Sequence, residues 1–181
     1  IEIGMAMPEN PTIFCKLPNA LAAHNETIGL PCGIEIDYEA ELVLIMGENG
    51  KIFAATCGND LSIREWQKAT TQWLCGKSYD GFGPMGPYAV DYASLPEGGL
   101  AISCRVNGEL RQNSTTEYLI HGVEDILTEL SEGMTLQAGT IIATGTPSGV
   151  AMGMEQPVYL KPGDVVECFI EGIGTLHNPV K

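Results

Sequence analysis

Short segments in which hydrophobic and polar residues alternate recur along the chain, and they predict a fold rich in β-strands. The clearest is a hairpin of residues 102–106 and 109–112, because Asn107-Gly108 between them is the preferred two-residue turn. Residues 42–46 are a continuous apolar run, which predicts a buried strand. Further strands are predicted at residues 13–14, 140–144 and 164–170.

Helical signals occur in two stretches. Residues 123–130 carry apolar positions at helical spacing, with acidic residues on the other face and Gly133 placed to end the helix. Nearer the N-terminus, Ser62 and Glu65 match a capping box, which predicts that Ser62 caps a second helix. Because strands outnumber helices and no regular β-α-β alternation appears, we predict an α+β fold that is mostly β, with a few short helices.

The composition is typical of one globular domain, which we expect to cover residues 1–181. Hydrophobic residues make up 44% of the chain and charged residues 18%, which excludes a disordered chain. No apolar run approaches the ~18 residues that a bilayer-spanning helix needs. The N-terminus has no start Met, no basic region and no signal-peptide core, so we expect the chain to begin inside a longer polypeptide.

Charge and cysteine usage narrow the partners and the compartment. The net charge of −14 argues against nucleic acid and anionic membranes, because binding phosphate groups needs a basic surface. Six cysteines without any C-x-x-C spacing indicate reduced thiols in an intracellular protein rather than a disulfide framework or a zinc site. We therefore expect a cytoplasmic protein, or one of an organelle matrix if a presequence lies upstream.

Two carboxylates stand at the start of the apolar run. Glu39 and Glu41 are two residues apart, so in a strand their side chains point to the same face. Side by side at the edge of a core they repel each other, and a hard divalent cation held by oxygen ligands is the simplest remedy. Asp60 is a natural third ligand, because the predicted helix that follows would fix its backbone. The absence of His or Cys at ligand spacing favours Mg²⁺ or Mn²⁺ over zinc.

Three other segments carry candidate chemistry, and each has a plainer alternative. Arg64 and Gln67 share one face of the second predicted helix, where they could also be ordinary surface residues. Lys77 stands between apolar residues and glycines, and it could stabilise an enolate or be a solvated loop lysine. Residues 144–150 form a loop of small residues whose amides and hydroxyls could hold a carboxylate, or simply make a tight turn.

Taken together, these segments resemble the fumarylacetoacetate hydrolase family, in particular its small single-domain members. Any one motif is weak, but the ordered set is specific and spans nearly the whole chain. The motifs are residues 11–16 (PTIFCK), 37–42 (DYEAEL), 59–67 (NDLSIREWQ), 72–80 (QWLCGKSYD), 106–112 (VNGELRQ), 144–150 (TGTPSGV) and 160–164 (LKPGD).

The resemblance implies a fold, a metal and an assembly. The family fold is a mixed β-sandwich roll, usually assembled as a homodimer. Its E-x-E pair and the aspartate of its Asn-Asp motif bind Mg²⁺ or Mn²⁺, and these positions correspond to Glu39, Glu41 and Asp60. The interval between Glu41 and Asp60 is shorter than is usual in the family, and Gly81 replaces a threonine commonly found near the metal.

The same resemblance implies roles in substrate chemistry. Lys77 is expected to assist catalysis, and Arg64, Gln67 and Thr146 are expected to lie near the substrate. Glu2 matches the Glu of a His-x-x-Glu pair in the family's lid, which supplies the general base. The His of that pair would precede residue 1, so the N-terminal lid segment is expected to be incomplete in this chain.

The resemblance also implies a small-molecule substrate, a 2-oxo or β-diketo acid. The first prediction is hydrolysis of a C–C bond in an acylpyruvate-type substrate, or the related oxaloacetate chemistry, through a metal-stabilised enolate. The alternatives are an oxaloacetate keto–enol tautomerase, a dienoate isomerase, and a catalytically silent homologue that binds a metal or metabolite. Trp66 and residues 72–73 and 157–161 look most like the branch that includes oxaloacetate tautomerases.

Overall fold

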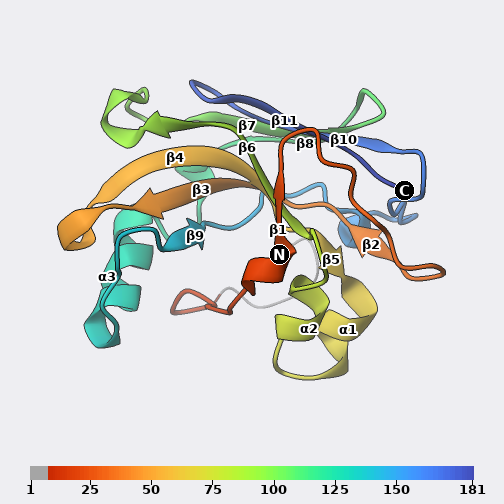
Figure 1. Ribbon diagram of the computed structural model, residues 1–181, viewed down its shortest axis with the longest axis horizontal. Helices are drawn as coiled ribbons and strands as arrows, with labels where there is room; N and C mark the ends of the chain where they lie inside the picture. The colour runs from red at the N-terminus through yellow and green to blue at the C-terminus, as the bar shows by residue number, and fades with distance from the viewer. Residues whose placement is uncertain (1–7) are drawn as a thin grey trace.

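The computed structural model describes residues 8–181, and within this range the strands form two packed sheets and one short ladder (Figure 1). The five-stranded sheet has the order β1-β6-β4-β3-β9. Its strands are β1 (Leu21–Ala23), β3 (Ala40–Met46), β4 (Ile52–Asn59), β6 (Gly83–Asp91) and β9 (Ile141–Ala143). β1 pairs with β6 in parallel and the other neighbours are antiparallel, so this sheet is mixed.

The four-stranded sheet is antiparallel and has the order β11-β10-β7-β8. Its strands are β7 (Ala101–Val106), β8 (Glu109–Thr115), β10 (Val165–Ile170) and β11 (Gly174–Pro179). A separate two-stranded ladder joins β2 (Ile36–Asp37) to β5 (Ser62–Ile63) and pairs Asp37 with Ser62. This ladder brings the segment before β3 beside the segment after β4.

Helices are short and lie on one side of the five-stranded sheet. The α-helices are α1 (Arg64–Ala69), α2 (Leu74–Lys77) and α3 (Val123–Gly133). In Figure 1 they lie on the side of β3 and β4 that faces away from β7, β8, β10 and β11. The 3₁₀ turns are η1 (Pro18–Ala20), η2 (Glu48–Gly50), η3 (Tyr92–Ser94), η4 (Thr116–Tyr118) and η5 (Ala151–Gly153). No helix in residues 8–181 is both long and apolar enough to cross a membrane.

The hydrophobic core contains alternate positions of the central strands. Leu42 and Leu44 of β3 belong to the same buried cluster as Cys104 and Cys168, which are opposite each other on β7 and β10. Because side chains alternate along a strand, Glu41 points to the face opposite Leu42. The strand that builds the core therefore also presents a carboxylate on its other face.

Most of the predicted elements are confirmed, including the mostly β fold of two packed sheets. The 107–108 turn joins β7 to β8, with Asn107 at φ 53° and Gly108 at φ 79°, the left-handed conformation that this turn requires. Strands β9 and β10 occupy the predicted segments, and α3 ends at Gly133 as expected.

Two local predictions are wrong. Residues 13–14 are not part of a strand. Ser62 does not cap a helix: it lies in β5, and its hydroxyl donates a hydrogen bond to the carbonyl of Asp60 at 2.8 Å. The helix begins at Arg64 with Ile63 as the preceding residue, because pairing with β2 keeps residues 62 and 63 extended.

Candidate metal and substrate site

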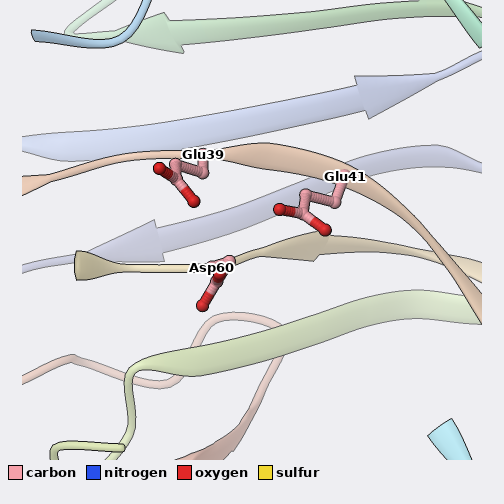
Figure 2. A group of neighbouring side chains, drawn as sticks. All are labelled: Glu39, Glu41 and Asp60. Carbon is pink, nitrogen blue, oxygen red and sulfur yellow. The ribbon is translucent and has the colours of Figure 1, made fainter. Parts of the chain in front are cut away.

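Three buried carboxylates meet at one end of β3 and β4. Glu39 directly precedes β3, Glu41 lies within it, and Asp60 directly follows β4. Each offers an oxygen, and these oxygens all lie within 4.8 Å of one another (Figure 2). The antiparallel pairing causes this, because it places Ala40 opposite Asn59 and lets the Asp60 amide donate to the Glu39 carbonyl at 2.8 Å. The structure therefore brings the three predicted ligands together.

Lys77 joins this cluster from the last residue of α2. Its ammonium donates to Glu39 Oε2 at 2.5 Å and to Asp60 Oδ2 at 2.6 Å. Burial would lower the pKa of Lys77, but the charges of Glu39 and Asp60 outweigh burial and raise that pKa to about 12. Lys77 is thus a buried, charged group and not the solvated loop lysine of the alternative interpretation.

A glycine makes this placement of Lys77 possible. A Cβ on Gly76 would lie 2.5 Å from the backbone nitrogen of Gln67 and 2.8 Å from its Cα. Side chains other than hydrogen would therefore push α2 away from α1. Because the two helices touch here, Lys77 and Gln67 reach the same site from neighbouring backbones.

Arg64 and Gln67 are buried, which excludes the surface alternative for both. The Arg64 guanidinium lies 2.6 Å from Glu39 Oε1 and donates to Gln67 Oε1 at 2.8 Å. Burial would lower the pKa of Arg64, but the charges of Glu39 and Asp37 outweigh it and raise that pKa. Arg64 therefore fixes a candidate metal ligand with one part of its guanidinium and the amide of Gln67 with another.

Sequence reasoning missed two charged residues of the site. Lys16 lies 2.7 Å from Asp60 Oδ1, and its ammonium also donates to the carbonyl of Phe82 at 2.9 Å and to that of Lys77. Asp37 is fully buried and bound to Arg64. Both residues stand inside motifs that carried the family resemblance. Lys16 has no local signal, because only long-range packing brings it to the site. Asp37 has one, since it stands two residues before Glu39, the spacing that also separates Glu39 from Glu41.

Ion pairs link these side chains into one alternating series. It runs through Asp37, Arg64, Glu39, Lys77, Asp60 and Lys16, so that each carboxylate lies next to a cation. Glu41 stands outside the series: no ion pair reaches it from residues 8–181, and the Gly145 amide donates to its Oε2 at 2.8 Å. Burial, followed by the charges of Asp60 and Glu39, raises the pKa of Glu41 to about 8.

The loop after β9 closes the site beside Glu41. Thr146 donates its hydroxyl to the carbonyl of Ala40 at 2.9 Å and accepts a hydrogen bond from Gln112 at 2.8 Å. Gln112 is 1% exposed and also accepts from the Ala40 amide at 3.0 Å. The loop thus binds a carboxylate through its Gly145 amide, as the small-residue pattern suggested, and that carboxylate belongs to Glu41. The predicted base, Glu2, lies outside the described residues.

The donor set fits a hard divalent cation. Its three carboxylates supply oxygen ligands, which are typical of Mg²⁺ and Mn²⁺ sites. Structural zinc sites use nitrogen and sulfur ligands instead. When Glu41 is ionised, the site has one more anion than cations among residues 8–181, because Glu41 adds a carboxylate to a series in which anions and cations are equal in number. A bound divalent cation would neutralise that excess and lower the cost of burying an ionised Glu41.

Comparison with known proteins gives consistent matches over the whole chain. Residues 2–181 match the family model described as fumarylacetoacetate (FAA) hydrolase C-terminal. Oxaloacetate tautomerase YisK of Bacillus subtilis (strain 168) is 38% identical, and the match covers 99% of this chain and 65% of that protein. The chain spans between 61% and 67% of the length of the curated relatives that it matches.

Solved structures agree with the fold. A fumarylacetoacetate hydrolase from the psychrophile Exiguobacterium antarcticum is 41% identical with a TM-score of 0.92, covering 99% of this chain and 69% of that chain. A 5-carboxymethyl-2-hydroxymuconate delta-isomerase from Mycobacterium smegmatis is 36% identical with a TM-score of 0.86, covering 98% of this chain and 71% of that chain. By their names, these relatives are a hydrolase, a tautomerase and an isomerase.

Proposed function

The chain belongs to the fumarylacetoacetate hydrolase family, and we propose that it is a divalent-metal-dependent enzyme that interconverts the keto and enol forms of a 2-oxo dicarboxylic acid such as oxaloacetate. The similarity to an oxaloacetate tautomerase supports this reaction over hydrolysis of an acylpyruvate, the first reaction predicted from the sequence. The observation that carries the proposal is the buried cluster of Glu39, Glu41 and Asp60 with Lys77 bound across two of its members.

In this proposal Glu39, Glu41 and Asp60 hold Mg²⁺ or Mn²⁺. The ion, when bound, supplies a Lewis acid that polarises the 2-oxo group of the substrate. The chain's own contribution is to hold three carboxylates on rigid backbone, because the ends of β3 and β4 and the Gly145 amide fix their positions. Such fixed ligands need little rearrangement when the site loads.

Lys77 is proposed to stabilise negative charge on the substrate as the enolate forms. Its hydrogen bonds within residues 8–181 use two of the three ammonium hydrogens, which leaves one to donate to a substrate oxygen. A charge-assisted hydrogen bond in a buried site is stronger than one in water, so it favours the enolate over the neutral keto form. Lys77 also stays protonated at neutral pH, since its pKa is raised to about 12.

Gln67 and Thr146 are proposed to lie beside the substrate. Arg64 holds the amide oxygen of Gln67, so the NH₂ group of Gln67 is the end that can donate to a substrate carboxylate. Arg64 itself is proposed to act on the substrate indirectly, because it orients Gln67 and Glu39. The proton transfer itself needs a general base, for which Glu2 is the candidate from the family resemblance.

Assays of the purified chain with Mg²⁺ and with Mn²⁺ test this function. Enolic oxaloacetate is supplied, and loss of its ultraviolet absorbance is followed together with pyruvate release and acylpyruvate cleavage. We expect metal-dependent ketonisation without stoichiometric pyruvate and without cleavage. Cleavage or decarboxylation faster than ketonisation would replace the tautomerase by a hydrolase or decarboxylase. Metal and oxalate binding without any turnover would instead support a catalytically silent homologue.

The muconate isomerase likeness supports a second candidate of the same chemical class. A dienoate isomerase also moves a proton through an enolate next to a carboxylate, so it needs the same three carboxylates and Lys77. A 2-hydroxydienoate added to the assay decides between the two substrates by comparison of kcat/KM. The predicted homodimer and the cytoplasmic location stay predictions from the resemblance and the composition.

A further inference from the structure

Asp37 is a buried carboxylate on which several donors converge, and the chemistry outlined above does not use it. It is 0% exposed. Its Oδ1 accepts from the Tyr38 amide at 2.9 Å and from the Ala151 amide at 2.7 Å. Its Oδ2 accepts from the Met152 amide at 3.0 Å and from Arg64 Nε at 2.8 Å, and Arg64 Nη2 lies 2.8 Å from the same oxygen. The two oxygens therefore face different groups.

Arg64 connects Asp37 to the site, because its guanidinium contacts Asp37 as well as Glu39 and Gln67. The guanidinium has five N–H donors, and in the described part of the chain they reach only Asp37, Glu39 and Gln67. Arg64 is 3% exposed, so its orientation is set by these three side chains and not by solvent. Because Asp37 is itself held by three backbone amides, it is the fixed end of the arrangement.

We propose that Asp37 is a positioning residue that fixes Arg64 and, through Arg64, the candidate metal ligand Glu39 and the substrate-facing amide of Gln67. This inference rests on the proposed function, because it assigns a role toward the same metal site. Asp37 shares the charge of Arg64 with Glu39. As a result Glu39 does not have to neutralise Arg64 alone, and it keeps more of its charge for a cation.

Replacement of Asp37 by Asn changes the oxygen that faces Arg64. Asn keeps the size of Asp and can still accept from the Tyr38 and Ala151 amides through its remaining oxygen. Its NH₂ group would then face the N–H donors of Arg64 and Met152, which puts donor against donor. Arg64 then loses its ion pair with Asp37, and Glu39 alone has to compensate the positive charge of Arg64.

The first experiment measures Mn²⁺ affinity by titration calorimetry of the metal-free chain. We expect D37N to weaken Mn²⁺ binding by about tenfold or more, the loss typical of residues that orient metal ligands. D164N is the matched control, because Asp164 is also buried at 5% exposure but its side chain accepts from Asn107 and the Lys161 amide, away from the cluster. D164N should stay within about twofold of the unsubstituted chain.

A double-mutant cycle with R64M decides whether Asp37 acts through Arg64. We expect D37N to change Mn²⁺ affinity by less than about twofold when Arg64 is already Met, because the link is gone. A tenfold loss from D37N in both backgrounds would overturn the positioning role, and so would equal affinities of D37N and D164N. Far-ultraviolet circular dichroism confirms that each variant is folded before its affinity is compared. Failure of the unsubstituted chain to bind Mn²⁺ is a different result, and it would contradict the proposed function.

Discussion

The β3–β4 pair and the β7–β8 hairpin are both antiparallel, yet they hold their polar groups together in different ways. Next to the hairpin, buried Asp164 accepts hydrogen bonds from Asn107 in the turn and from the nearby Lys161 amide, and no ion pair reaches it from residues 8–181. At the end of β3–β4, by contrast, the carboxylates depend on cations from distant segments. A neutral partner can satisfy one buried carboxylate, whereas a cluster needs compensating charge.

Because of this difference, stability at the β3–β4 end should depend on the cations that pair with its carboxylates. The stability of the hairpin should depend on the backbone conformation of its turn. Within the described residues, Lys77 is shared by Glu39 and Asp60, so one substitution there affects two buried carboxylates. The turn of the hairpin depends instead on the left-handed conformation of Asn107 and Gly108.

The largest effect is expected for Lys77→Met. This change removes the shared partner of two buried ion pairs and leaves Glu39 with Arg64 and Asp60 with Lys16 as their remaining cations. We expect the metal-free chain to lose about 3–5 kcal/mol of unfolding free energy, measured by urea denaturation. Excess Mn²⁺ should restore part of this loss, since a bound cation replaces the missing charge. A loss below about 1 kcal/mol would show that the pairs do not stabilise the fold.

Glu39→Gln is expected to reduce Mn²⁺ affinity by at least about 100-fold, because it removes a charged ligand and leaves Arg64 and Lys77 near the cation with one carboxylate partner each instead of two. Titration calorimetry measures the change. Asp164→Asn serves as the control for loss of a buried carboxylate elsewhere. Unchanged affinity in Glu39→Gln would mean that these carboxylates do not form a metal site.

Metal binding is expected to depend on pH through Glu41. The pKa of Glu41 is raised to about 8, so its carboxyl is protonated at lower pH in the metal-free chain and must lose that proton to become a ligand. Mn²⁺ affinity should therefore rise by up to about tenfold per pH unit as pH increases toward 8, and then level off. Titrations from pH 6 to pH 9 would measure this change, which corresponds to ~1.4 kcal/mol of binding free energy per pH unit. In Glu41→Gln this rise in affinity with pH should be absent.

The same group sets the sign of a stability effect. Because the folded-state pKa of Glu41 lies above its ordinary value of 4.5, its contribution to stability is fully present below pH 4.5 and is lost as pH rises through about 8. The metal-free chain should thus lose thermal stability over that window. If the thermal stability of the unsubstituted chain did not change over this pH range, or changed as it does in Glu41→Gln, this assignment would be contradicted.

The smallest effect is expected in the hairpin. Gly108 has φ 79° and no atom within 4 Å of an added Cβ, so Gly108→Ala meets conformational strain and no clash. We expect a loss of about 1 kcal/mol in unfolding free energy. Mn²⁺ affinity should not change, because the turn is not part of the cluster. A loss of metal affinity in this variant would show that the two regions are coupled, and the contrast drawn above would fail.

Several features of the site could be predicted from local sequence. The spacing of Glu39 and Glu41 beside an apolar run predicts two carboxylates on one face, and the structure places both with Asp60. The Asn107-Gly108 pair predicts its hairpin for a similarly local reason, since Asn and Gly tolerate the left-handed conformation that a two-residue turn requires. In these cases the information lies within a few residues of the feature that it determines.

Other features could not be predicted locally, and Ser62 shows why. Its spacing to Glu65 satisfies a capping box, yet pairing with Asp37 across the β2–β5 ladder keeps it extended. That pairing is long-range, and it overrides a local preference of about 1 kcal/mol.

The sequence by itself determined the alternating strands, their turns and the presence of adjacent carboxylates, because these follow from side-chain period and backbone conformation. Only the tertiary structure decided which cation neutralises each carboxylate. Lys16 and Arg64 reach Asp60 and Glu39 from other segments, and Glu41 is left to accept from an amide. Burial is the physical reason, since removal of water makes the choice of partner decisive for a charge, and burial arises only when distant segments pack together.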